Sequence, residues 1–180
     1  MMRRLGTFTA LLTLLIAVSA LVALAVAPGT YTPTAGSFNG ANAPGSAHLA
    51  SGTVQCVVNA NLSITCDDYV LGGVGNTNAA IALAADYTAT IDCTNHGGNL
   101  VESHTSDFSA SSTAAVASTR NGQLRVPEQS VSPFSAPQVC PNPNWTPSIR
   151  AGTLVLEEFT YTLTFAGFTS PYITITASDP

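Results

Sequence analysis

Apolar residues occupy every second position of residues 81–93, "IALAADYTATIDC". Successive side chains of an extended strand point to opposite faces, so this alternation predicts a half-buried β-strand. Its apolar face would carry Ile81, Leu83, Ala85, Tyr87, Ala89, Ile91 and Cys93. The opposite face carries Asp86 and Asp92, which we interpret as solubilising rather than catalytic.

Two shorter alternating runs, "TVQCVV" (53–58) and "LSITC" (62–66), flank a polar turn. Two such runs around a short turn predict a β-hairpin. The pairing brings Cys56 opposite Cys66. Facing residues have Cβ atoms about 4.5–5.5 Å apart, slightly more than a disulfide needs. We therefore expect a Cys56–Cys66 disulfide.

Turn signals separate further strands. The stretch "TNHGGN" (94–99) follows the long strand, and its Asn and Gly residues favour a reversal of the chain. Asn121-Gly122 is a strong hairpin signal. It predicts pairing of residues of about 113–120 with residues of about 123–126, which Pro127 would end.

The C-terminal part contains two more alternating runs, "GTLVLEEFTYTLTF" (152–165) and "YITITA" (172–177). In the first run the apolar parity changes at Glu157-Glu158, which predicts a β-bulge there. The two glutamates are then surface residues of the bulge rather than an acid–base pair.

No helical period of useful length follows the first residues, and seven or eight strands are predicted over residues 51–180. This content predicts an all-β fold, an immunoglobulin-like antiparallel β-sandwich in the broad sense. The order Cys, Trp, Cys of antibody domains is absent, because Trp145 follows both Cys93 and Cys140.

The first 25 residues resemble a signal peptide. Arg3 and Arg4 precede an apolar run, and Ala23-Leu24-Ala25 matches the cleavage pattern, which places cleavage before Val26. The alternative is an uncleaved N-terminal anchor, the only contact with a membrane that we expect.

Residues 26–50 are rich in Pro, Gly, Ser, Thr and Asn and show no apolar period. This composition predicts a flexible tether, with His48 exposed to solvent. The expected organisation is a signal peptide over residues 1–25, the tether over residues 26–50 and the β-sandwich domain over residues 51–180.

The four cysteines all follow the predicted leader. An even number of cysteines in an exported chain is typical of disulfides. With Cys56 and Cys66 paired, Cys93 and Cys140 pair by elimination. Zinc is the alternative, but the chain has no C-x-x-C pair and the spacings are wide.

The charge balance excludes two classes of partner. The chain has no lysine, and beyond the leader ten acidic residues against three arginines give a net charge of −7. Nucleic acids and anionic membranes bind clustered cations, so neither is expected as a partner. The surface is instead expected to consist mainly of Ser, Thr, Asn and Gly.

Candidate chemistry is sparse. His96 in the predicted turn, with Glu102 and His104 on one face of the next strand, could hold a metal if the turn folded back. We favour a polar turn instead and expect no metal or other cofactor. The acidic pairs Asp67-Asp68 and Glu157-Glu158 and the many serines form no catalytic motif, so no catalytic residue is expected.

Trp145 and Tyr172 are the candidates for stacking on a sugar ring. Trp145 lies in "CPNPNWTP", which a disulfide at Cys140 would hold beside the end of the long strand. We expect its indole ring to cover that disulfide and the edge of the core.

Three motifs, "GVGN" (73–76), "CTNHGGN" (93–99) and "CPNPNW" (140–145), resemble those of a group of small exported actinobacterial proteins. The likeness covers roughly residues 52–180. The resemblance implies export and a β-rich domain, and it implies no activity.

The sequence therefore favours a non-catalytic β-sandwich module that is secreted or held in the cell envelope, with an envelope polysaccharide or a protein as its partner. The alternative is an extracellular carbohydrate- or metal-binding domain. A secreted hydrolase is the third possibility, and fold alone does not choose among them.

Overall fold

The alternating residues 81–93 belong to the central strand β6 (Ala79–Thr94) of the computed structural model, which describes residues 25–135 and 138–178. Every odd-numbered residue of β6 is buried, and every even-numbered residue after Ala79 is partly or fully exposed. The predicted half-buried strand is confirmed. Its apolar face supplies one wall of the core.

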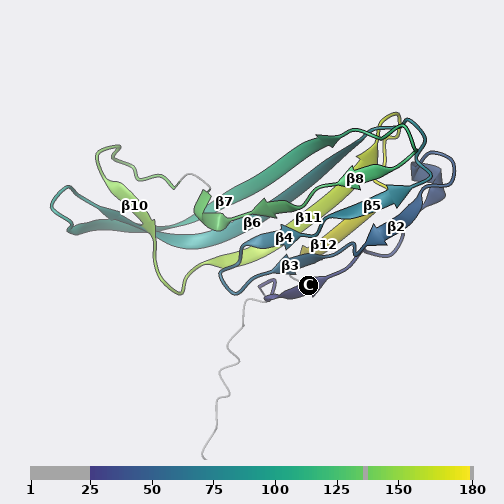
Figure 1. Ribbon diagram of the computed structural model, residues 1–180. Coiled ribbons are helices and arrows are strands. Elements are labelled where there is room, and N and C mark those ends of the chain that lie inside the picture. Colours follow the sequence, from purple (N-terminus) through teal and green to yellow (C-terminus); the bar gives the residue numbers. More distant parts are fainter. Residues whose placement is uncertain (1–24, 136–137, 179–180) are drawn as a thin grey trace, which may run out of the picture.

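The first layer of the sandwich is built around β6, which pairs with neighbours along both edges. One edge pairs with β7 (Leu100–Val116), and the other pairs with β11 (Val155–Phe165) and with β10 (Thr146–Ile149). β12 (Ile173–Ser178) pairs with β11. All of these pairs are antiparallel (Figure 1).

The C-terminal end of β6 and the N-terminal end of β7 extend beyond the rest of the molecule, together with β10 (Figure 1). We call residues 89–106 and 138–150 the arm. The inner face of the arm carries a small apolar cluster of Ala89, Ile91 and Cys93, separate from the main core. Cys140 and neighbouring residues of its segment cover that cluster.

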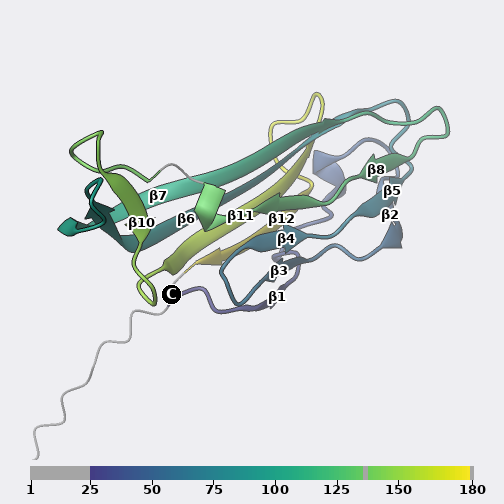
Figure 2. The same ribbon diagram turned by 60° about the vertical axis from the view of Figure 1, so that its left-hand side comes forward.

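The second layer contains shorter strands. They are β1 (Gly29–Tyr31), β2 (His48–Gly52), β3 (Cys56–Val58), β4 (Ile64–Cys66), β5 (Tyr69–Gly72), β8 (Leu124–Val126) and β9 (Gln129–Val131). They form two sheets, β1-β3-β4-β9 and β2-β5-β8, which lie end to end (Figure 2). Short interruptions separate strands that follow one another in the chain. At one of them Pro127, which has no N–H to donate, separates β8 from β9.

The main core lies between the two layers. Its five largest fully buried side chains are aromatic: Tyr87, Tyr161, Tyr172, Phe159 and Phe165. The hydroxyl groups of Tyr69 on β5 and Tyr161 on β11 lie 2.9 Å apart and form a buried hydrogen bond between the layers. Burial raises the pKa of Tyr161 to about 12 and raises the pKa of Tyr69 as well, because desolvation disfavours a phenolate.

The predicted hairpin and both disulfides are present. Cys56 faces Cys66 in the β3–β4 register and is bonded to it, and Cys93 is bonded to Cys140. No described cysteine is free. The predicted bulge is also confirmed, because the register of β11 on β6 shifts between Leu156 and Glu158.

The prediction of a flexible tether over residues 26–50 is wrong, because this segment packs on the sandwich. The Val26 side chain is buried, and its N–H donates a hydrogen bond of 2.9 Å to the Leu156 carbonyl. The strands β1 and β2 pair with β3 and β5. Gly73, at φ +71°, gives this segment room, because a Cβ there would clash with the Ser46 carbonyl.

Two aromatic residues explain why a segment of this composition is ordered. The Tyr31 ring meets Phe159 edge-on, with ring centroids 5.2 Å apart, and Phe38 meets Tyr172 edge-on at 5.5 Å. Such contacts contribute stability beyond the area that they bury. The composition of residues 26–50 predicts flexibility, but these two aromatic contacts hold the segment on the sandwich.

The second hairpin differs from its prediction. Asn121-Gly122 does form a turn, in which the Gly122 N–H donates to the Thr119 carbonyl. The Thr119 N–H also donates to the Gln123 carbonyl, and a β-bridge joins Ser118 to Leu124. Beyond it, β8 leaves β7 and pairs with β5 in the other layer. The turn connects the two layers rather than two neighbouring strands of one sheet.

The predicted signal peptide, residues 1–25, lies outside the described residues except for Ala25. Within the described part of the chain, no helix has the length and apolar character needed to cross a membrane.

The buried tyrosine pair predicts a coupled effect on stability. Tyr161→Phe leaves the Tyr69 hydroxyl buried without a partner and should cost about 1–3 kcal/mol in the free energy of unfolding. The double variant Tyr69→Phe/Tyr161→Phe removes both hydroxyls and should lie close to the wild type. Urea unfolding of all four proteins tests this, and fully additive losses would contradict it.

The same pair predicts a loss of stability in alkali. The folded state raises the pKa of both tyrosines, so their contribution is fully present below pH of about 10. It decreases as pH rises above that value, because the unfolded tyrosines release protons that the folded ones keep. Thermal unfolding between pH 8 and pH 11 should show a smaller decrease for the double variant.

Candidate functional site

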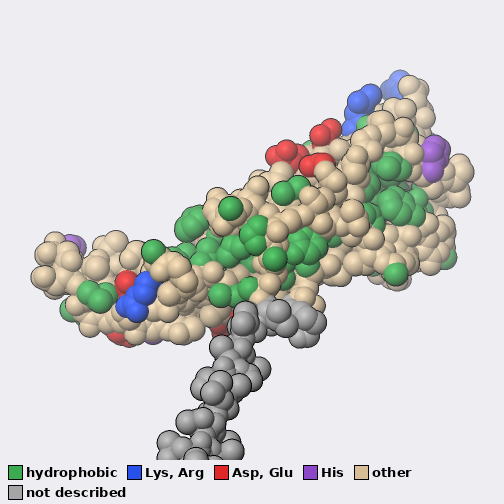
Figure 3. Space-filling model, turned by 90° about the horizontal axis from the view of Figure 1, so that it is seen from below, with side chains coloured by type: hydrophobic (Ala, Val, Ile, Leu, Met, Phe, Trp, Pro, Cys, Tyr) green, Lys and Arg blue, Asp and Glu red, His purple; other side chains and the backbone are tan. Residues whose placement is uncertain are grey.

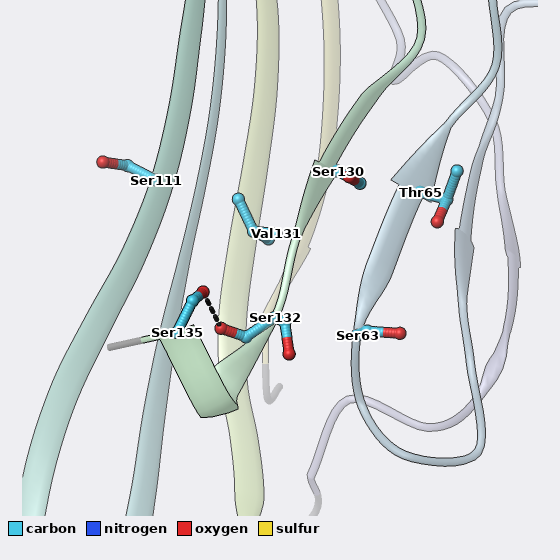
Figure 4. Close-up of a pocket in the computed structure, with 7 residues that line it drawn as sticks. All are labelled: Ser63, Thr65, Ser111, Ser130, Val131, Ser132 and Ser135. Carbon is cyan, nitrogen blue, oxygen red and sulfur yellow. Dashed lines mark hydrogen bonds between the residues drawn. The ribbon is translucent and has the colours of Figure 1, made fainter. Parts of the chain in front are cut away.

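A hollow of about 360 Å³ lies on the side of the sandwich where β9 and η2 (Pro133–Ser135) run beside β7 (Figure 4). Its lining consists of hydroxyl groups and one valine: Ser63, Thr65, Ser111, Ser130, Val131, Ser132 and Ser135. We call it the hydroxyl hollow. The Ser135 hydroxyl donates to the Ser132 carbonyl at 2.7 Å, and this hydrogen bond stabilises the η2 turn (Figure 4).

Strand alternation places the hydroxyls. Thr65 and Ser130 are register partners in β4 and β9, and each lies between two inward-facing residues of its strand. Both side chains therefore point away from the core. Gln129, the neighbour of Ser130, is buried, and its Oε1 accepts a hydrogen bond of 2.8 Å from the Ser112 hydroxyl. This bond ties β9 to β7 behind the hydroxyl hollow.

The chemistry of the hydroxyl hollow is that of a neutral hydrogen-bonding surface. Hydroxyl groups can both donate and accept hydrogen bonds, so the lining suits a ligand that itself carries hydroxyl or amide groups. A serine nucleophile needs an adjacent base, and no residue of this lining is ionisable. The arrangement can bind, and it lacks the base that acyl transfer would require.

A second hollow of about 460 Å³ is mainly apolar. Its lining includes Leu62, Phe134, Ile149 and Leu154, together with Arg150. Phe134 is 63% exposed there, which is high for so large an apolar side chain. Figure 3 shows a face of the molecule on which hydrophobic side chains gather along the middle.

An ion pair fastens the outer face of the arm. Arg150 contacts Asp92 through Nη2–Oδ1 at 2.6 Å and Nε–Oδ2 at 3.1 Å, and it also reaches the Ser103 hydroxyl. The hydrogen bonds from Arg150 and Ser103 lower the pKa of the Asp92 carboxyl. This contact joins β6, β7 and the end of β10, and its geometry indicates a structural role.

The residues of the weak metal hypothesis do not assemble into a site. Glu102 and His104 lie on the same face of β7, as predicted, with Oε1 and Nδ1 3.7 Å apart. His96 lies in the exposed turn after β6. Among the residues that the structure describes, no group of three His, Cys, Asp or Glu side chains could hold a metal ion.

The two stacking candidates have different environments. Tyr172 is only 2% exposed, and its hydroxyl donates to the Ala47 carbonyl, so this candidate ring packs in the core. Trp145 is partly buried and packs on the apolar cluster of the arm, beside Cys140. It covers that cluster, as the sequence suggested.

A scan of protein-family models, a search of curated proteins and a search of solved structures each gave no match to this chain. Function is therefore inferred from the residues of the chain itself.

The position of Trp145 predicts its contribution to stability. Trp145→Ala removes the cover of the arm cluster and should cost about 2–3 kcal/mol, less than a fully buried tryptophan would. The melting temperature should fall by several degrees. Trp145→Phe, which keeps an aromatic cover, should lose less. Equal melting temperatures for Trp145→Ala and the wild type would contradict this assignment.

The ion pair predicts a response to acid. Because the folded state lowers the pKa of Asp92, its contribution is present above pH of about 4 and is lost as pH falls through the folded pKa. NMR titration should find the Asp92 midpoint below that of an ordinary aspartate. Arg150→Gln should raise this midpoint, whereas the control Arg125→Gln should leave it unchanged.

Proposed function

We propose that this chain is a non-catalytic β-sandwich module that is secreted or held in the cell envelope and acts by binding. The observation that carries the proposal is the lining of the hydroxyl hollow, in which six of the seven residues are serine or threonine and none is ionisable. Two disulfides fit an oxidising compartment, where such bonds persist.

The ionisable groups with shifted pKa values support the same proposal. They are the tyrosines of the core and the Asp92–Arg150 pair of the arm. Catalytic sites usually place such groups in a cleft. In this chain they pack the core or fasten strands to one another, so their shifts come from structural contacts.

A carbohydrate is the ligand class that the hydroxyl hollow favours. Sugars present many hydroxyl groups, and side-chain hydroxyls match them as both donors and acceptors. An envelope polysaccharide is therefore the partner that we propose to test first. A metal-binding role has less support, because Glu102 and His104 have no third ligand among the described residues.

Retention on insoluble envelope polysaccharide tests the proposal. The wild type should be retained and should release no soluble fragments. Ser130→Val and Ser132→Val each remove a hydroxyl from the hydroxyl hollow, and each should lower retention severalfold. Thr160→Val is the matched control, because Thr160 is exposed on β11, away from the hollow.

Two outcomes would count against the proposal. Release of soluble fragments that disappears in an acidic-residue variant such as Glu102→Gln would indicate a hydrolase. Equal retention of the wild type, the two serine variants and the control would show that the hydroxyl hollow is not the binding site.

A further inference from the structure

β7 has a long free edge. One edge pairs with β6 from Leu100 to Val116. Among the strands that the structure describes, none pairs with the other edge, and β7 lies at the outside of its layer (Figure 2). Alternate residues of an edge strand turn their N–H and C=O groups outward, so this edge can accept another strand.

The other strand edges of the sandwich are short or covered. β12 has six residues, and the N–H groups of Thr34 and Phe38 donate hydrogen bonds to its segment, to the carbonyls of Thr174 and Tyr172. The edge strands of the second layer have three to five residues each. β7, with 17 residues, is the exception.

Natural proteins protect long edges with lysine, proline, bulges or inward-pointing charges. β7 contains no lysine and no proline, and its register on β6 is regular from residue 102 to residue 116. Residues 108–119 contain no charged side chain. The side chains of this stretch are therefore uncharged and the register of β7 is regular, as edge-to-edge pairing requires.

The charges that flank the neutral stretch indicate which strand fits it. Antiparallel pairing of two β7 strands centred on Ser111 places Asp107 of each copy opposite Ala115 of the other. It also carries the Glu102 end of one copy toward the Arg120 turn of the other. Arg120 is exposed and forms no ion pair within the described residues. A register centred on Asp107 would instead place two acids opposite each other, which is unfavourable.

We propose that two copies of this chain associate through the β7 edges, antiparallel and centred on Ser111, so that the first layers join into one continuous sheet. The contact is symmetric, with the same surface on both copies. Backbone hydrogen bonds supply the attraction, and the charge pattern selects the register. The proposal concerns the strand edge and not a ligand, and its tests contain no polysaccharide, because Ser111 also lines the hydroxyl hollow.

Sedimentation velocity over a concentration series tests the association. The wild type should shift from monomer to a species of twice the monomer mass as concentration rises. Ser111→Lys places two lysines opposite each other at the centre of the contact and should raise the dissociation constant at least tenfold. Thr160→Lys is the control, because it adds the same charge to an exposed position of β11 in the same sheet. It should associate as the wild type does.

A cysteine scan checks the register without relying on a charge. Ser111→Cys should form an intermolecular disulfide under mild oxidation, because symmetric facing residues lie within reach of each other. Thr160→Cys should remain monomeric on non-reducing gels, and peptide mapping should show both native disulfides intact in each variant.

The proposal would be overturned if the wild type stayed monomeric at millimolar concentration. A wild type that stayed monomeric but bound an added peptide at the β7 edge would overturn it as well. It would also be overturned if Ser111→Lys and Thr160→Lys had equal dissociation constants. Dimers that cross-link no better through Ser111→Cys than through Thr160→Cys would exclude the β7 edge as the contact.

Discussion

The pairing of β6 along both of its edges is the constraint on which the rest of the structure depends. Its odd-numbered side chains form one wall of the main core and, further along, the apolar cluster of the arm. Its edges fix the positions of β7, β10 and β11. A shift of one residue in any of these pairings would turn a row of apolar side chains toward solvent. The bulge after Leu156 lets β11 keep its apolar face on the core despite the change of parity at the two glutamates.

The fold is predictable from the sequence where an element depends on residues that are close together in the chain. The strand over residues 81–93, the hairpin that joins Cys56 to Cys66 and the bulge at Glu157-Glu158 all depend on neighbouring residues. The sequence predicts the wrong partner for β8, because a turn signal specifies a reversal of the chain and not the sheet that receives the next strand. The order of residues 26–50 was missed because it depends on two aromatic contacts with residues more than 120 positions away in the chain.

The candidate site was less predictable than the fold. Serine and threonine are so frequent in this sequence that no spacing distinguishes those of the hydroxyl hollow from the others. The contact between Gln129 and Ser112 joins two strands that belong to different layers, and no local signal indicates it. Asp92 and Arg150 are 58 residues apart and meet only because β10 returns to the end of β6. The position of Trp145 is predictable because Cys140, in the same short segment, is bonded to Cys93 at the end of β6.

The Cys93–Cys140 disulfide has a mechanical consequence. If the molecule were stretched between Val26 and Ser178, tension would pass from residue 93 to residue 140 through the two sulfur atoms. The loop of chain closed by this bond contains β7, β8 and β9, so these strands would carry no covalent load. The smaller Cys56–Cys66 loop would likewise be spared. The contour length that could be released by force is therefore much shorter than the chain, and β7 would keep its place beside β6 until the noncovalent contacts of β6 itself gave way.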